Sequence, residues 1–256
     1  MYLRQKKEVG ILPMLRFICE ICGKEFEASH RRKQIHCPLC AESLRSRGLG
    51  PRQQISQTAQ RINPEVKEID WSSANNTLLY YLERFNRYSV YDGIIPNEMD
   101  LLTDDDRHLA NQIAARMGID VWMPIIGQSI SNIQQWDLLS MTDIEWQCCK
   151  EVVRKEIPNL LHKGIGIARL TKALHRKRPQ LIPICDSVLC KALNVGNNDE
   201  VDTLVECMSK LRSIGQANEW LLGELQMKYK AKGYDLSELR ILEILYWVQY
   251  GPFPVK

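Results

Sequence analysis

Two glycines separated by one apolar residue, Gly164 and Gly166, mark a tight turn in the second half of this chain. The stretch from Leu160 to Gln180 carries six basic residues and no acidic one. A helix-length segment follows the second glycine, stops at a proline-rich stretch, and leads to Asp186, twenty residues after Gly166. Backbone N–H groups at such a turn bind phosphate. The pattern predicts two helices joined by a phosphate-binding turn. The structural alternative is a simple corner between helices in which Asp186 caps the next helix.

The order of these features resembles the helix-hairpin-helix (HhH-GPD-like) DNA glycosylases. The matching residues are Gly164-Ile-Gly166, the basic helix after it, and Pro183-Ile-Cys-Asp186. The resemblance implies that the hairpin grips a DNA phosphate, with charge added by Lys163 and Arg169. It further implies that Asp186 faces the sugar of an extruded base, where its carboxylate stabilises the oxocarbenium-like sugar or helps to activate water.

One position departs from the strand-cutting members of that family. Their catalytic lysine stands two residues after the second hairpin glycine, and here that residue is Ala168. Lys172 lies one helical turn later, so it is a candidate catalytic residue that needs a different geometry. No four-cysteine iron–sulfur loop follows Asp186 either. The resemblance therefore implies hydrolysis by water, with no Schiff base formed at the usual position.

Four cysteines near the N-terminus have the spacing of a metal site. Two CxxC pairs lie fourteen residues apart, and zinc binds four thiolates in a tetrahedron. We expect a structural zinc ion on Cys19, Cys22, Cys37 and Cys40, in a zinc-ribbon or treble-clef module. The alternative is a set of unrelated buried or reactive cysteines. The loop between the pairs is basic, and we expect Arg31, Arg32 and Lys33 to contact DNA phosphates. A protein-docking module is the other interpretation.

The charge distribution also favours a polyanionic partner. Residues 1–60 hold eleven Lys and Arg against five Asp and Glu, a net charge of +6, whereas the other residues hold 23 against 26, a net charge of −3. Solvated surface charge is the alternative explanation. No apolar run approaches the ~20 residues of a membrane span, and the first residues lack the apolar core of a secretory signal. We expect a cytoplasmic protein.

Most of the chain shows helical periodicity and little strand-like alternation. We expect a mainly α fold with three parts: a zinc module at 1–50, a linker at 51–64, and a helical, HhH-GPD-like domain at 65–256. The pattern and its capping residues predict helices over about 72–85, 103–117, 131–139, 142–155, 187–193, 218–230 and 236–250, and a further helix between Gly166 and Pro179.

A second resemblance covers roughly residues 70–250. The stretches Leu101–Ala110, Arg178–Val188 and Leu239–Trp247 resemble a bacterial family known as DUF6308. That family implies no activity. Its Pro-x-x-Asp-Ser-Val block is the same block that places Asp186 in the first resemblance.

A pocket for an extruded base needs flat apolar walls. We predict Trp146, Trp122 and Tyr81 as wall residues, from a wider set of tryptophans and tyrosines that includes Trp247. Core packing is the alternative for each of them. Asp143 or Glu145 is a candidate second carboxylate beside the pocket.

The hypothesis that combines these features is a monofunctional DNA glycosylase. It would excise a damaged, modified or foreign base from double-stranded DNA by water-mediated hydrolysis, in repair or in phage defence. Structural zinc is the expected cofactor, and no obligate protein partner is inferred. The first alternative is a non-catalytic DNA-binding protein that holds phosphates with the zinc module and the hairpin. A protein-interaction scaffold, which would not bind DNA, is the second.

Overall fold

The computed structural model describes residues 15–18, 25–28, 66–196 and 199–251, and the chain divides into two compact units, Met1–Gln60 and Arg61–Lys256. In the first unit, strand β1 (Leu15–Ile18) pairs antiparallel with β2 (Glu25–Ala28), with Leu15 opposite Ala28. The predicted zinc ligands and the basic loop lie outside the described residues, namely Cys19, Cys22, Cys37, Cys40, Arg31, Arg32 and Lys33. The predicted linker, 51–64, lies outside them too.

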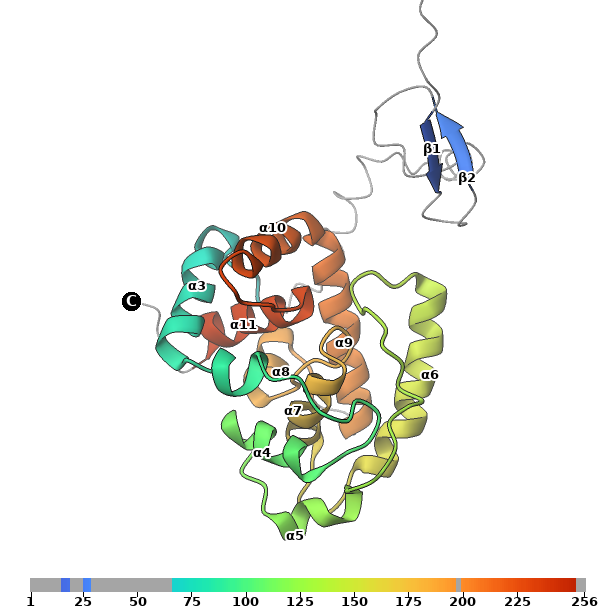
Figure 1. Cartoon of the computed structure of the whole chain (residues 1–256), viewed down its shortest axis with the longest axis vertical. Helices are drawn as coiled ribbons and strands as arrows, with labels where there is room; N and C mark the ends of the chain where they lie inside the picture. The colour runs from blue at the N-terminus through green and yellow to red at the C-terminus, as the bar shows by residue number, and fades with distance from the viewer. Residues whose placement is uncertain (1–14, 19–24, 29–65, 197–198, 252–256) are drawn as a thin grey trace, which may run out of the picture. The chain divides into compact units, whose positions relative to one another are not determined.

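The second unit is helical, so the prediction of a mainly α chain is confirmed (Figure 1). With the labels of Figure 1, its helices are α3 (Ala74–Tyr80), α4 (Asp104–Gln112), α5 (Ile119–Trp122), α6 (Asp143–Leu160), α7 (Ile167–Lys177), α8 (Ser187–Leu193), α9 (Glu200–Ala217), α10 (Glu219–Lys230) and α11 (Glu238–Tyr250). Short 3-10 turns span Trp71–Ser73 and Met123–Ile125, and two π-helical turns, Tyr81–Phe85 and Tyr88–Asp92, follow α3. Among the described helices, none is both long and apolar enough to cross a membrane.

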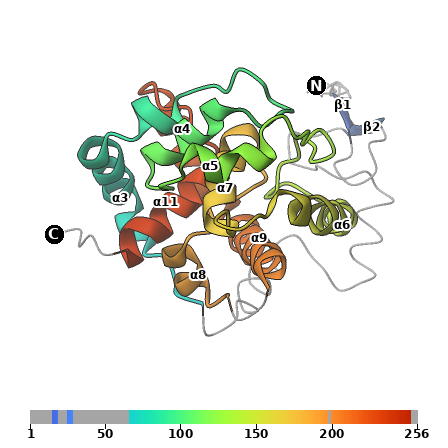
Figure 2. The same cartoon turned by 90° about the horizontal axis from the view of Figure 1, so that it is seen from below.

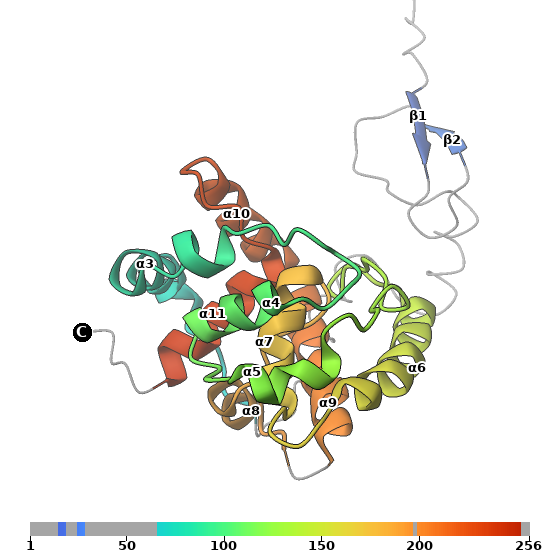
Figure 3. The same cartoon turned by 60° about the horizontal axis from the view of Figure 1, so that its bottom comes forward.

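Helix α7 lies at the centre of this unit. Seen from below, α4 and α5 lie on one side of it and α8 and α9 on the other (Figure 2). In the tilted view α4 and α9, which both contact α7, again lie on opposite sides of it (Figure 3). Leu170, Ala173 and Leu174 have no exposed surface. Because other helices cover α7 on both sides, packing holds its side chains in fixed positions.

Three of the six basic residues between Leu160 and Gln180 point inward. Arg176, Lys177 and Arg178 are buried. The Lys177 ammonium lies 3.0 Å from the Asp106 carboxylate, and the Arg178 guanidinium lies 2.6 Å from that of Asp100. The Arg176 guanidinium donates to the Ile94 carbonyl and lies over the Tyr91 ring. All three cations are therefore held within the fold, so they are not part of a DNA-binding surface. Only the first half of the basic stretch can serve that purpose.

The predicted helix over 131–139 is wrong, because the segment is a series of turns. Its carbonyls accept hydrogen bonds from outside the segment: the Arg178 guanidinium donates to the carbonyls of Ile130 and Ile133. A helix would have used those carbonyls internally. Two predicted ends also shift. Helix α4 stops at Gln112 because Ala114 and Arg116 adopt positive φ, and α6 continues through Pro158 to Leu160.

Candidate functional site

A cavity of about 400 Å³ opens where the end of α3, the end of α4, α7, α8 and α11 meet. Aromatic and aliphatic side chains make most of its wall, and five charged side chains reach it: Arg87, Lys172, Asp186, Arg240 and Glu243. The other lining residues are Tyr81, Phe85, Ile113, Ala114, Ile184, Leu189, Ile244 and Trp247. An apolar hollow with a few convergent polar groups is typical of a small-molecule or nucleobase site.

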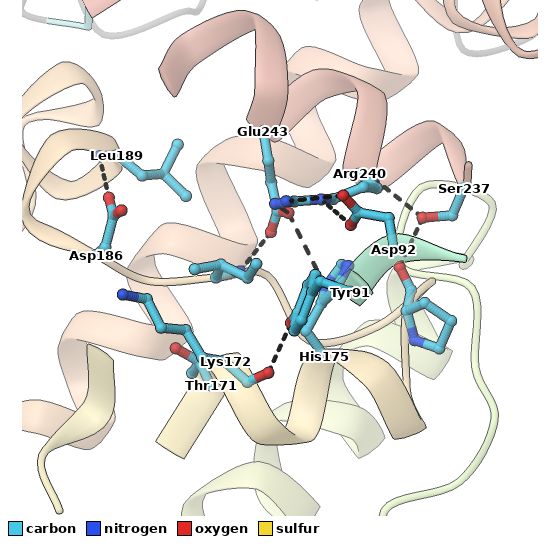
Figure 4. Close-up of polar contacts among 12 residues, drawn as sticks. Tyr91, Asp92, Thr171, Lys172, His175, Asp186, Leu189, Ser237, Arg240 and Glu243 are labelled. Atoms are coloured by element: carbon cyan, nitrogen blue, oxygen red, sulfur yellow. Dashed lines mark hydrogen bonds and ion pairs between the residues drawn. The ribbon is translucent and has the colours of Figure 1, made fainter. Parts of the chain in front are cut away.

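Asp186 caps α8 and lines the cavity at the same time. Its Oδ1 accepts hydrogen bonds of 3.0 Å from the backbone N–H groups of Val188 and Leu189 (Figure 4). Its Oδ2 accepts no hydrogen bond from the described residues, and the side chain is partly exposed. The cap therefore fixes the orientation of the carboxylate and leaves one oxygen for a ligand. Both interpretations of this residue, cap and site, are compatible with the geometry.

Lys172 projects from the middle of α7 into the same cavity. Burial lowers the pKa of its ammonium group, and the arginines Arg240, Arg169 and Arg116 lower it further. Asp186 opposes that shift, which places the two side chains within electrostatic range of each other. The Lys172 carbonyl accepts a 2.6 Å hydrogen bond from the Tyr91 hydroxyl (Figure 4), so this turn of the helix is anchored.

Arg240 is the centre of a buried polar network at the inner end of the cavity. Its guanidinium contacts the Asp92 carboxylate at 2.8 Å and the Glu243 carboxylate at 3.1 Å (Figure 4). The Tyr81 hydroxyl accepts from Arg240 at 2.7 Å and donates to Asp92 at 2.8 Å. Each polar group of the network has a hydrogen-bond partner within it, and buried polar groups are stable only under that condition.

Glu243 is a site residue that the sequence analysis missed. It is 3% exposed, its Oε1 accepts the Ile184 N–H, and its Oε2 accepts from Arg240. Burial raises the pKa of this carboxyl to about 7, against the opposing effect of Arg240. A sequence signal did exist: Arg240 and Glu243 are charged residues three apart within an otherwise apolar helix, and such residues are rarely buried without a partner or a function. Asp143 and Glu145, the predicted second carboxylates, instead lie in the first turn of α6 and do not line the cavity.

The aromatic wall consists of Tyr81, Phe85 and Trp247. Their rings meet at centroid distances of 5.1 to 6.2 Å, and Trp247 packs edge-on against both of the others. The structure thus places Tyr81 in the wall. Trp122 and Trp146 do not line the cavity: both are buried in the core, and the Trp122 indole N–H donates to the Thr103 carbonyl at 2.8 Å.

The turn predicted for the hairpin forms between α6 and α7. The Ile165 N–H donates to the His162 carbonyl at 2.8 Å, and Gly164 adopts φ +89°, which a side chain would strain. Gly166 caps α7, and Arg169 donates to the Gly164 carbonyl. Lys163 and Gly164 are exposed, and no hairpin residue lines the cavity.

An internal carboxylate already occupies the hairpin. The Ile167 N–H, the donor just after the second glycine, is bound by the Glu200 carboxylate from the start of α9. A Cβ on Gly166 would lie 3.1 Å from that carboxylate, so glycine allows its close approach. A phosphate that used this donor would have to displace Glu200.

Comparison with known proteins adds one match. Residues 127–250 match the model of a family described only as a family of unknown function, DUF6308. The match is narrower than the expected 70–250: it includes Lys172, Asp186, Arg240 and Glu243, whereas Tyr81 and the Leu101–Ala110 stretch precede it. No curated protein and no solved structure matches the chain. Within the described residues, no group of three or more His, Cys, Asp or Glu side chains could hold a metal ion.

Proposed function

We propose that this protein is a DNA glycosylase that hydrolyses the N-glycosidic bond of a damaged, modified or foreign base. The observation that carries the proposal is the meeting of Asp186, Lys172 and a wall of aromatic rings at one cavity. A base extruded from a duplex needs a pocket of this kind, with apolar rings for its faces and polar groups for its edges.

Positive charge around the cavity supports a polyanionic partner. Arg87 is exposed at the wall, and Arg116 and Arg169 lie near enough to lower the pKa of Lys172. Lys163 is exposed on the hairpin at the start of the same helix. Basic side chains around a concave site attract a polyanion and contact its phosphates without reading sequence.

The proposed chemistry assigns separate roles to the two partly buried groups. The Oδ2 atom of Asp186 faces the sugar as positive charge develops on it and stabilises that charge, which exists only near the transition state. Water then attacks the sugar carbon. The Lys172 ammonium lies at the same cavity, within electrostatic range of the Asp186 carboxylate, and supplies positive charge beside it. Ala168 provides no amine, so the proposed product is an intact abasic site.

Release of a free base is the direct test. We expect the full chain, incubated with genomic DNAs that differ in base modification, to liberate at least one base that mass spectrometry detects. The DNA should retain abasic sites without strand breaks. Binding to the same DNAs, measured by gel shift, should weaken steeply with salt. If no base is released from DNA that the protein binds, the enzymatic proposal is excluded and a DNA-binding function remains.

That second function is favoured by one specific observation. Asp186 Oδ1 is fully used as the N-cap of α8, as in a helix with no catalytic role. A non-catalytic DNA-binding protein would contact phosphates with the hairpin and the basic N-terminal unit. Its affinity for DNA would not depend on the charge of Asp186.

We also propose that the first unit binds structural zinc through Cys19, Cys22, Cys37 and Cys40. Purified full-length protein should contain about one zinc ion per chain by plasma mass spectrometry, and Cys19→Ser should lose most of it because three ligands bind more weakly than four. All six tryptophans follow residue 70, so their fluorescence reports on the helical unit alone. Zinc removal should leave that signal unchanged and weaken DNA binding. Unchanged zinc content in Cys19→Ser would contradict this ligand set.

A further inference from the structure

We propose that Glu243 donates a proton to the departing base, and that the substrate is therefore an uncharged base rather than a cationic, alkylated one. This inference deepens the proposed glycosylase function and depends on it. It adds a second catalytic carboxyl to the site and narrows the class of base.

The two carboxyl groups differ in exposure, so we assign them to different parts of a bound nucleotide. Asp186 is partly exposed, whereas Glu243 is almost completely buried on the side of the cavity closed by α11. Figure 4 shows Asp186 at the turn before α8 and Glu243 on α11. The Ile184 N–H, two residues before Asp186, donates to Glu243. An extruded nucleotide enters base first, so its base reaches Glu243 while its sugar stays near Asp186.

The charges around Glu243 favour a proton on it. One guanidinium, Arg240, is shared by two buried carboxylates, Asp92 and Glu243. Asp92 is the closer partner of Arg240, at 2.8 Å against 3.1 Å for Glu243, and it does not line the cavity. Arg240 therefore compensates the negative charge of Glu243 only in part, and burial makes that charge unfavourable.

Among the described residues, no second cation forms an ion pair with Glu243. Helix α7 contributes His175, whose Nδ1 lies 3.9 Å from Glu243 Oε2 and 2.8 Å from the Ile182 carbonyl. Burial holds the pKa of His175 well below its usual value, so the ring is neutral and donates to that carbonyl. The remaining titratable groups that face Glu243 or share its cavity are Tyr81, Arg87, Tyr91, Asp92, Lys172, Asp186, Cys207 and Arg240.

The reaction balances as a simple hydrolysis. The bond between the sugar carbon and the base nitrogen breaks, and its electron pair goes to the base. The Glu243 carboxyl gives its proton to a ring nitrogen or carbonyl oxygen of that base, which leaves neutral. Water adds to the sugar carbon and loses one proton, and solvent returns a proton to Glu243. A base that already carries a positive charge leaves without this help.

Two classes of probe test the assignment. Duplexes containing uracil or hypoxanthine supply neutral leaving bases, and duplexes containing 7-methylguanine or 3-methyladenine supply cationic ones. We expect the wild-type protein to release a neutral base, and Glu243→Gln to slow that release by about a hundredfold or more, the usual contribution of a general acid. Release of a cationic base, where it occurs, should change less than threefold. The matched control is Glu238→Gln, on the same helix but away from the cavity, which should behave as wild type.

The pH dependence gives a second measurement that needs no variant. The proton donor is the acid form, so the wild-type rate for a neutral base should fall as pH rises above about 7, the value to which burial raises the pKa of Glu243. In Glu243→Gln that fall should be absent, and the variant should keep the Ile184 contact because an amide oxygen still accepts. Unfolding followed by tryptophan fluorescence checks that it is folded.

The outcomes separate this inference from the function on which it depends. No base released from either class by the wild-type protein refutes the glycosylase function itself. Three outcomes would keep the glycosylase function and refute the role of Glu243. They are release of cationic bases only, equal slowing of both classes by Glu243→Gln, and a wild-type rate that does not fall above pH 7.

Discussion

Asp186→Asn is expected to slow base release by at least about a hundredfold, the typical effect of removing one preorganised charge or donor at a transition state. The substitution removes the negative charge that faces the sugar. It keeps the α8 cap, because an asparagine side-chain oxygen accepts the Val188 and Leu189 N–H groups as well as an aspartate oxygen does. Single-turnover release from the best substrate duplex measures the effect, and gel shifts should show DNA binding at wild-type affinity or slightly above.

The chain offers a close control for that variant. Asp199 caps α9 with the same geometry, accepting from the N–H groups of Val201 and Asp202 at 2.8 Å, and it does not line the cavity. Asp199→Asn should therefore leave base release unchanged. Full activity of Asp186→Asn would refute the proposed mechanism, and equal losses in both variants would show that the effect comes from the caps.

Arg240→Met is expected to lower the free energy of unfolding by about 3–5 kcal/mol, the usual result of removing one partner from a buried ion pair. The Asp92 carboxylate, which has no exposed side-chain surface, would lose its counter-charge, and the Tyr81 hydroxyl would lose a donor. Urea unfolding of the full chain, followed by tryptophan fluorescence, measures the helical unit because all six tryptophans lie there.

A double variant identifies the cause of that loss. Arg240→Met with Asp92→Asn leaves no unpaired charge at this position, so it should recover part of the lost stability. Lys230→Met removes one partner of an exposed pair with Asp235 and should have no measurable effect. If the double variant is less stable than Arg240→Met alone, packing rather than charge dominates at this site.

The features that the sequence predicted well are those governed by local rules. The start of α6 follows from the Thr142 and Glu145 capping box, and the start of α8 follows from Asp186 as a cap. The turn at Gly164 follows from a backbone conformation that favours glycine. Helix α9 was not predicted, although Asp199 caps it, and the predicted helix over 131–139 gave way to bonds from Arg178, a distant residue.

For the candidate site, the sequence alone predicted Asp186 and Lys172, together with the Gly164 turn that lies outside the cavity, because all three fall within one stretch of about twenty residues. Only the tertiary structure decided which side chains share the cavity with Asp186 and Lys172. Tyr81, Arg240 and Glu243 reach the cavity from segments far away in the chain, and three nearby basic residues turn inward. The physical reason is that burial and charge pairing depend on which helices meet, and no local pattern records that. The pKa of Glu243 is raised because this carboxyl is buried on α11 and shares the Arg240 guanidinium with Asp92. The proposed role of Glu243 as an acid depends on that raised pKa.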